Sequence, residues 1–155
     1  MKPVFVRLKL LISITTILLW IGLIFYFANA SGWESWQASG RALEAVQSIG
    51  APIESEELVR KMAHVFLYAV LGGLSLNLLH QLGVIKKRWA EWVSERKFRL
   101  ALIIPLVVAV VDEVSQYFTP GRSGVWYDVV LDVIAAAIVV GVVYRICKVR
   151  EKQES

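Results

Sequence analysis

Apolar residues fall along the chain in four long stretches, separated by shorter segments that are charged or broken by proline and glycine. These stretches predict helices at about residues 8–28, 56–82, 99–118 and 125–146. Each is long enough to cross the hydrocarbon core of a bilayer, which takes about 20 residues. The 155 residues are 57% apolar and only 19% charged, a composition that excludes an ordinary soluble domain. We therefore predict an all-α membrane protein, a single domain over residues 1–155 with four transmembrane helices.

The segment between the first two spans has the pattern of an amphipathic helix. Trp33 and Trp36 fall on one face, opposite Glu34 and Arg41. Ser31 and Glu34 have the spacing of a capping box, which marks the start of a helix. Tryptophan favours the level of the lipid headgroups, so we expect a helix that lies on the membrane surface. A lid over a binding site is the alternative interpretation.

Two interpretations also apply to the N-terminal span. Its apolar run, residues 10–27, is followed by Ala28-Asn29-Ala30, a small-x-small pattern typical of signal-peptide cleavage. Signal peptides usually have apolar cores of only about 7–15 residues, and this run is longer. We expect the segment to be retained as a membrane anchor rather than cleaved at Ala30.

The orientation in the membrane follows from the basic residues. Lysine and arginine concentrate in the N-terminal tail, the 86–99 loop and the C-terminal tail, whereas the 29–57 segment is net acidic. By the positive-inside rule, the three basic segments are cytoplasmic. We expect a multi-pass protein of the cell membrane with both termini in the cytoplasm. The 86–99 loop also carries tryptophans, but between two spans it indicates a lipid surface and not nucleic acid.

Small residues and prolines predict local features of the bundle. Ala69 and Gly73 form a small-x-x-x-small patch that allows close helix packing. Pro105 lies inside the third span and deprives the carbonyl of Ala101 of its helical partner, so a neighbouring group must bond that carbonyl. A tight turn is expected where Gly121 follows Pro120.

A layer of polar residues is the feature that four apolar helices do not explain. In the orientation above, the second and fourth helices begin, and the third ends, at the outer face. Counting 1.5 Å per residue from the helix ends places five of its residues at a similar depth, roughly 5–13 Å below the outer boundary: His64, Asp112, Glu113, Asp128 and Asp132. Ionisable residues inside a span are costly and indicate a function by default. The candidate ligand-binding residues are Arg60, Lys61, His64, Tyr68, Asp112, Glu113, Gln116, Arg122, Asp128 and Asp132.

The layer allows two interpretations, a polar pocket or a knot of salt bridges and hydrogen bonds that fixes three helices together. Arg122, followed by the backbone N–H groups of Ser123 and Gly124 at the start of a helix, is typical of an anion site. Asp128 and Asp132 lie one turn apart beside it and would make the pocket amphoteric. We favour a pocket that opens at the outer surface and is supported by the knot.

Metal and cofactor chemistry has little support in the sequence. The chain has two histidines, His64 and His80, a single cysteine, and no Cys-x-x-Cys spacing, so we expect neither a zinc site nor a cofactor. If the protein is an enzyme, the candidate catalytic residues are His64, Asp112 and Asp128.

The spacing of the polar residues is similar to that of a known family. The matching pieces are Lys61-x-x-His64-x-x-x-Tyr68, Asp112-Glu113-x-x-Gln116, Pro120-Gly121-Arg122 and Asp128-x-x-x-Asp132. Together, and over the whole chain, they resemble the VanZ-like family, which is named for a factor associated with resistance to teicoplanin. The resemblance implies a small bacterial four-helix membrane protein whose shared polar residues lie at these positions.

Three functions remain open at this point. The first is a binding protein of the cell envelope that recognises an amphipathic or lipid-linked anion at the outer leaflet, such as a cell-wall precursor or a lipoglycopeptide. The second is an intramembrane hydrolase or transferase that acts on lipid-linked phosphate. The third, a transporter, has less support because no inverted repeat is visible. Membrane lipids are the expected partners, and the oligomeric state is left open.

Overall fold

The computed structural model describes residues 3–29, 32–50, 52, 54–82, 95–122 and 124–154, and in these residues it contains five helices and no strand. The helices are α1 (Pro3–Ala28), α2 (Gly32–Ser48), α3 (Glu56–Gln81), α4 (Glu95–Tyr117) and α5 (Trp126–Glu154). Four of them contain segments long and apolar enough to cross a membrane, namely Phe5–Ala28, Glu56–Gln81, Arg99–Tyr117 and Trp126–Ile146. The predicted fold class is confirmed.

Three helices are longer than predicted. α1 begins at Pro3, α4 begins at Glu95, and α5 continues to Glu154, well past the last apolar residue of its span. The residues added to α4 and α5 are mostly charged and are good helix formers, so the backbone there stays helical beyond the apolar pattern. Hydropathy located the spans but not the ends of the helices.

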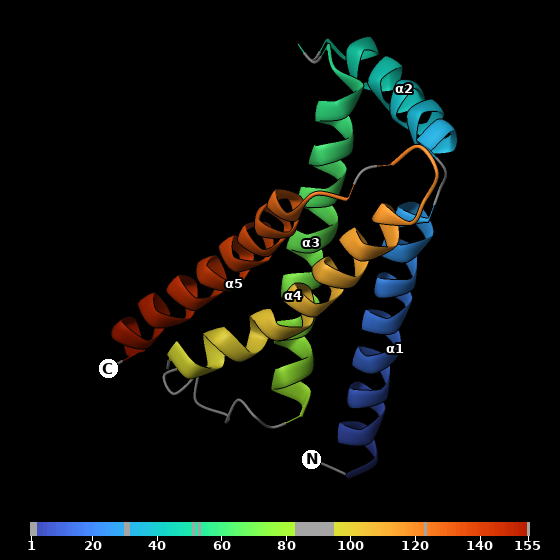
Figure 1. Ribbon diagram of the computed structural model, residues 1–155. Helices are drawn as coiled ribbons and strands as arrows, with labels where there is room; N and C mark the ends of the chain where they lie inside the picture. Colours follow the sequence, from blue (N-terminus) through green and yellow to red (C-terminus); the bar gives the residue numbers. More distant parts are fainter. Residues whose placement is uncertain are drawn as a thin grey trace.

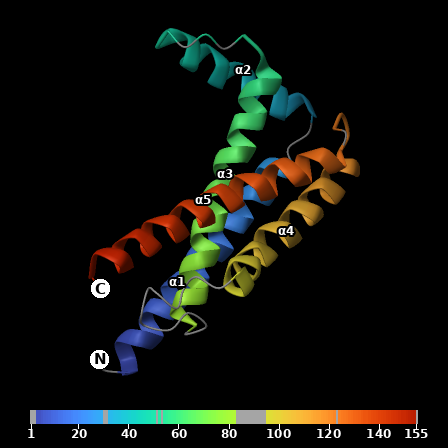
Figure 2. The same cartoon turned by 90° about the vertical axis from the view of Figure 1, so that its left-hand side faces the viewer.

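α3 is the central helix, and it packs against each of the other four. α2 crosses the end of the bundle where α1 ends and α3 begins, and both chain termini lie away from it (Figures 1 and 2). α4 and α5 run side by side as a hairpin, inclined to α3. α4 ends and α5 begins towards the α2 end of the bundle. The turn between them has Gly121 at φ 75°, as the tight-turn prediction requires.

Close approach between α3 and α5 depends on one glycine. A Cβ atom added at Gly72 would lie 2.8 Å from the carbonyl oxygen of Ala136, which is closer than a real Cβ can approach another atom. At Gly73, which the sequence pattern singled out, the added Cβ would make an ordinary contact of 3.7 Å with Val139. The small-residue patch was therefore predicted on the correct helix, but the essential glycine is the neighbouring one.

The carbonyl that Pro105 leaves without a helical partner is bonded by another helix. Ser75 Oγ of α3 donates a hydrogen bond of 2.7 Å to the carbonyl oxygen of Ala101. Ser75 and Ala101 are both fully buried, so water cannot replace this bond. The prediction that a neighbouring group bonds this carbonyl is confirmed.

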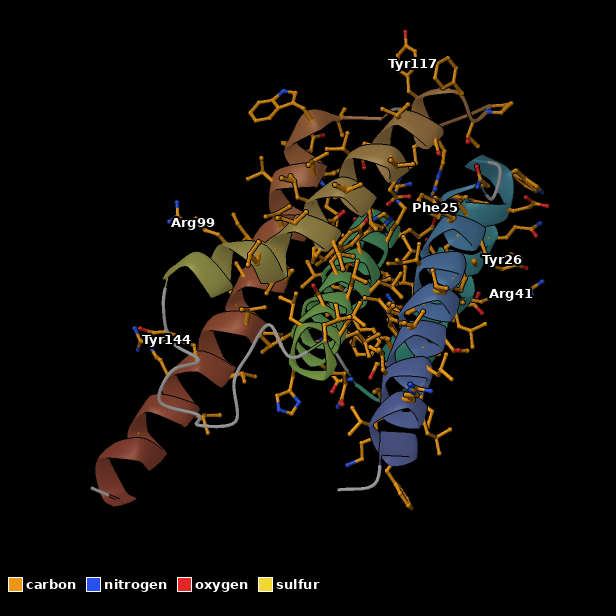
Figure 3. The ribbon with its side chains drawn as sticks, turned by 90° about the horizontal axis from the view of Figure 1, so that it is seen from below. Phe25, Tyr26, Arg41, Arg99, Tyr117 and Tyr144 are labelled. Carbon is orange, nitrogen blue, oxygen red and sulfur yellow. The ribbon has the colours of Figure 1, made fainter. Side chains whose placement is uncertain are left out.

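Aromatic side chains at the α2 end of the bundle face outwards. On α2, Trp33 and Trp36 stack on one another at 5.1 Å and are exposed, whereas Ser35 between them is buried. Tyr26 on α1 and Tyr117 on α4 also project from the bundle (Figure 3). This distribution suits the interface of a membrane, where aromatic residues are enriched. The predicted capping residue Ser31, the proposed cleavage residue Ala30 and residues 83–94 of the basic loop lie outside the described residues.

Candidate functional site

A polar cavity of about 180 Å³ lies near the end of the bundle that α2 crosses. It is formed where the first turns of α3 face the beginning of α5 and the turn that follows α4. Of the predicted site residues, Tyr68, Asp112 and Glu113 lie outside its lining, and the others form most of it. The lining residues are Arg60, Lys61, His64, Gln116, Gly121, Arg122, Asp128, Leu131 and Asp132.

His64 is held between two aspartates from different helices. Its Nδ1 atom lies 3.8 Å from Asp112 Oδ2 of α4 and 3.6 Å from Asp132 Oδ2 of α5. Behind this group, Tyr68 donates a hydrogen bond of 3.1 Å from its hydroxyl to Asp112 Oδ2. Both aspartates and Tyr68 are fully buried. The expected convergence of α3, α4 and α5 on one polar cluster is therefore observed.

Arg122 has a different local role from the one expected. It was expected to form an anion site with the N-terminus of the helix that follows it. Instead, its guanidinium extends to the end of α1 and to α2, where it donates hydrogen bonds to the carbonyl oxygens of Phe27 (3.1 Å) and Ala28 (2.8 Å) and to Ser35 Oγ (2.7 Å). The last carbonyls of a helix carry partial negative charge, so a cation there caps α1. Burial lowers the pKa of Arg122 from its ordinary value. Because an arginine side chain is not deprotonated in proteins, the guanidinium stays charged. Ser35 was not predicted, because a serine on a surface helix carries no signal of its own.

The beginning of α5 is occupied by Glu113 rather than free. Its Oε2 atom accepts a hydrogen bond of 2.7 Å from the backbone N–H of Val125. Gly124 fits beside it because an added Cβ would collide with the backbone carbonyl of Glu113. Ser123, whose N–H was also expected in the anion site, lies outside the described residues. Glu113 therefore acts as a cap that joins α4 to α5.

The cations near the cavity do not pair directly with its buried acids. Lys61 forms an ion pair with Glu57 one turn earlier on α3, at 2.8 Å, and lies 5.7 Å from the ring centre of Tyr127. Arg60 is exposed and has no hydrogen bond or ion pair among the described residues. The cationic and acidic residues share the cavity, as predicted, but the expected knot of salt bridges is mostly absent from the part of the chain that the structure describes.

A second cavity, which the sequence did not predict, adjoins the first. Its volume is about 430 Å³, and its walls are mainly apolar side chains of α1, α2 and α3. Trp20 and Leu23 of α1, Ala38 and Ala42 of α2, and Leu67 of α3 are typical of its lining. Arg60, His64 and Arg122 line both cavities, so they form the junction between the polar cavity and the apolar one.

Comparison with known proteins shows which family the chain belongs to. The family model described as VanZ/LLP1 matches residues 13–148, which is most of the chain. The chain belongs to the VanZ/LLP1 family. Searches of curated proteins and of solved structures found no match.

The match covers the last three spans in full, the first span from residue 13 onwards, and every predicted site residue of this VanZ/LLP1 protein. It confirms the resemblance that the spacing of the polar residues indicated, and with the four candidate spans it makes the chain a multi-pass membrane protein.

One group in this VanZ/LLP1 protein has the residue types of a metal site. Ligand atoms of His64, Asp112 and Asp132 all lie within 4.8 Å of one another. The expectation of no metal depended on the absence of paired histidines and cysteines in the sequence. Because these three residues come from three helices, no local spacing could have indicated them.

Proposed function

We propose that this protein binds an amphipathic anion, with the charged head in the polar cavity and the apolar chain in the adjoining one. The observation that carries the proposal is that Arg60, His64 and Arg122 line both cavities. A molecule with a charged head and an apolar chain would place its charge at these residues. Neither cavity alone points to such a ligand.

The charges at the junction favour an anionic head. Arg60 forms no hydrogen bond or ion pair among the described residues, and Arg122 uses three of its five N–H groups on Phe27, Ala28 and Ser35. Phosphate and carboxylate are the groups that arginine recognises best. Asp128 and Asp132 also line the polar cavity, so a head that also carries hydroxyls or an amine would be bound better than phosphate alone.

The proposed setting is the outer leaflet of a bacterial cell envelope, with both termini in the cytoplasm. It is supported by the basic residues near the ends of α1, α4 and α5 that lie away from α2 (Figure 1), and by the exposed aromatic residues near α2. A lipid-linked cell-wall precursor and a lipoglycopeptide such as teicoplanin share the required chemistry, an apolar chain attached to a polar head. A role in teicoplanin resistance would follow if the protein withholds either molecule from the other.

Thermal stabilisation in detergent tests the head of the ligand. A short-chain polyprenyl phosphate should raise the melting temperature of the protein, and the matching polyprenyl alcohol should raise it much less. Arg60→Gln should weaken binding of the phosphate roughly tenfold, which is the loss of about one charge-assisted hydrogen bond. The control is Arg41→Gln, on α2 and outside both cavities (labelled in Figure 3). Equal stabilisation of both variants would contradict the proposal.

The apolar chain needs a separate test. Ala63 lines the apolar cavity, so Ala63→Trp would fill it, whereas Met62→Trp places the same bulk on an exposed position of the same helix. The first variant should lose binding of teicoplanin, and the second should retain it. Binding of teicoplanin and of its acyl-free core with equal affinity would show that the apolar cavity does not bind the chain.

The second candidate function, a hydrolase or transferase acting on lipid-linked phosphate, is favoured by one observation. His64 lies beside two aspartates and borders the polar cavity, as a general base or nucleophile would. Release of phosphate from the polyprenyl phosphate, lost in His64→Ala, would establish it. Binding without turnover would leave the protein a binding protein.

A further inference from the structure

The three helices that meet behind the polar cavity place one nitrogen and two carboxylate groups around a common point. His64 comes from α3, Asp112 from α4 and Asp132 from α5. The distances from His64 Nδ1 to the two Oδ2 atoms, 3.8 and 3.6 Å, are too long for hydrogen bonds. Ligand atoms that each lie about 2.0–2.2 Å from one ion are roughly 3–4 Å apart. Both histidine–aspartate distances therefore fit a shared ion better than a direct hydrogen bond.

Buried oxygen atoms without partners are the second, independent observation. The side chain of Asp132 is 1% exposed, and neither of its oxygens accepts a hydrogen bond. Asp112 is equally buried, and its Oδ1 atom has no partner, while Oδ2 accepts the bond from Tyr68. A buried polar group without a partner is costly, and an ionised one is far more so. These oxygens therefore require a further group that donates a hydrogen bond to them or carries a positive charge.

The protein's own cations do not supply that group. Among the described residues, no lysine or arginine forms an ion pair with Asp112 or Asp132, because Lys61 pairs with Glu57 and Arg122 bonds α1 and Ser35. Even a protonated His64 leaves one net negative charge on the cluster. A divalent cation with a neutral imidazole brings the net charge to zero, which is the cheapest state in a low-dielectric environment.

We propose that His64, Asp112 and Asp132 bind a divalent transition-metal ion, of the Zn²⁺ or Mn²⁺ kind. Imidazole favours zinc and similar ions, and carboxylates favour manganese, so a mixed set suits these two. Tyr68 is then a positioning residue, because its hydroxyl orients Asp112 as groups behind metal ligands commonly do. His64 and Asp132 also line the polar cavity. Three protein ligands leave a coordination position open, and a ligand oxygen in the cavity could reach it.

The test uses the full-length protein in detergent, stripped with a chelator and dialysed against Zn²⁺ or Mn²⁺. Bound metal is measured by inductively coupled plasma mass spectrometry. The wild type should bind one ion per chain in a saturable way. His64→Ala and Asp132→Asn should each weaken binding by more than about a hundredfold, because the loss of a residue that only orients a ligand costs roughly 10–100-fold. Two controls match them: His80→Ala changes the other histidine, and Glu44→Gln changes an exposed carboxylate on α2 that lines neither cavity.

Each outcome decides the proposal. Loss of metal binding in His64→Ala and Asp132→Asn, together with retained binding in both controls, supports it. Absence of saturable binding of either ion, or equal binding in all four variants, overturns it and leaves a histidine–aspartate ion pair as the content of the cluster. If the first pair does not fold, X-ray absorption of the zinc-loaded His80→Ala protein decides instead. A shell with one imidazole supports the proposal, because His64 is then the last histidine in the chain, and a shell without imidazole overturns it.

Discussion

The hydrogen bond from Ser75 to the Ala101 carbonyl allows a quantitative test of how this bundle accommodates Pro105. Proline has no N–H group, so the carbonyl four residues earlier loses its helical partner. Ser75 Oγ takes that place at 2.7 Å, in a site from which water is excluded. Ser75→Ala should leave the carbonyl without any partner. Hydrogen bonds between membrane helices contribute about 0.6 kcal/mol on average and up to about 1.7, and an unsatisfied buried group costs about 1–3 kcal/mol. We expect a loss of about 1.5 kcal/mol.

The second variant, Pro105→Ala, tells this explanation apart from a simple loss of packing. Residue 105 then has an N–H group that can bond the Ala101 carbonyl within α4. In that background, Ser75→Ala should cost only about 0.5 kcal/mol, so the coupling energy of the double-mutant cycle should be about 1 kcal/mol. Unfolding in mixed micelles of sodium dodecyl sulfate and a mild detergent, followed by circular dichroism, measures all four proteins.

The control for this cycle is a serine that contacts another part of the bundle. Ser13 Oγ of α1 accepts a hydrogen bond of 2.9 Å from Asn77 Nδ2. Ser13→Ala should therefore cost the same with and without Pro105, because the two sites share no partner. If Ser75→Ala also costs the same in both backgrounds, within about 0.3 kcal/mol, the carbonyl does not depend on the serine and the reasoning is refuted.

Three further predictions use the same unfolding assay. Gly72→Ala should lower the free energy of unfolding by about 1–3 kcal/mol because α3 and α5 must move apart, whereas Gly73→Ala meets only an ordinary contact and should change it little. Equal costs of the two substitutions would contradict the close approach of the helices at Gly72. Trp20→Phe should lose about 0.5–1.5 kcal/mol, since it removes the 2.9 Å hydrogen bond from Nε1 to the Leu67 carbonyl, and an unchanged midpoint would show that this bond contributes nothing. Gly121→Ala should cost about 1–2 kcal/mol, because an alanine is strained at φ 75°, and a neutral result would mean that the turn relaxes.

Much of the architecture could be predicted because hydropathy acts locally. The bilayer sets the length of each span, and so the four spans and the surface helix could be found without any tertiary contact. The position of Pro105 likewise predicted that the Ala101 carbonyl needs a partner from outside its own helix, but it did not indicate that Ser75 is that partner. Counting the rise per residue from the helix ends was enough to expect that His64, Asp112 and Asp132 would meet.

The partners of the polar residues were decided only by the tertiary structure. Arg122 was expected to complete an anion site with the helix that follows it, yet its donors reach the end of α1 and Ser35 of α2. Glu113 was expected in the pocket, and it caps the beginning of α5 instead. The apolar cavity also left no trace in the sequence, because its lining residues look like ordinary lipid-facing or surface positions. The physical reason is the same in each case. Burial in a membrane is a property of one helix, whereas a hydrogen-bond partner or a cavity depends on how several helices cross.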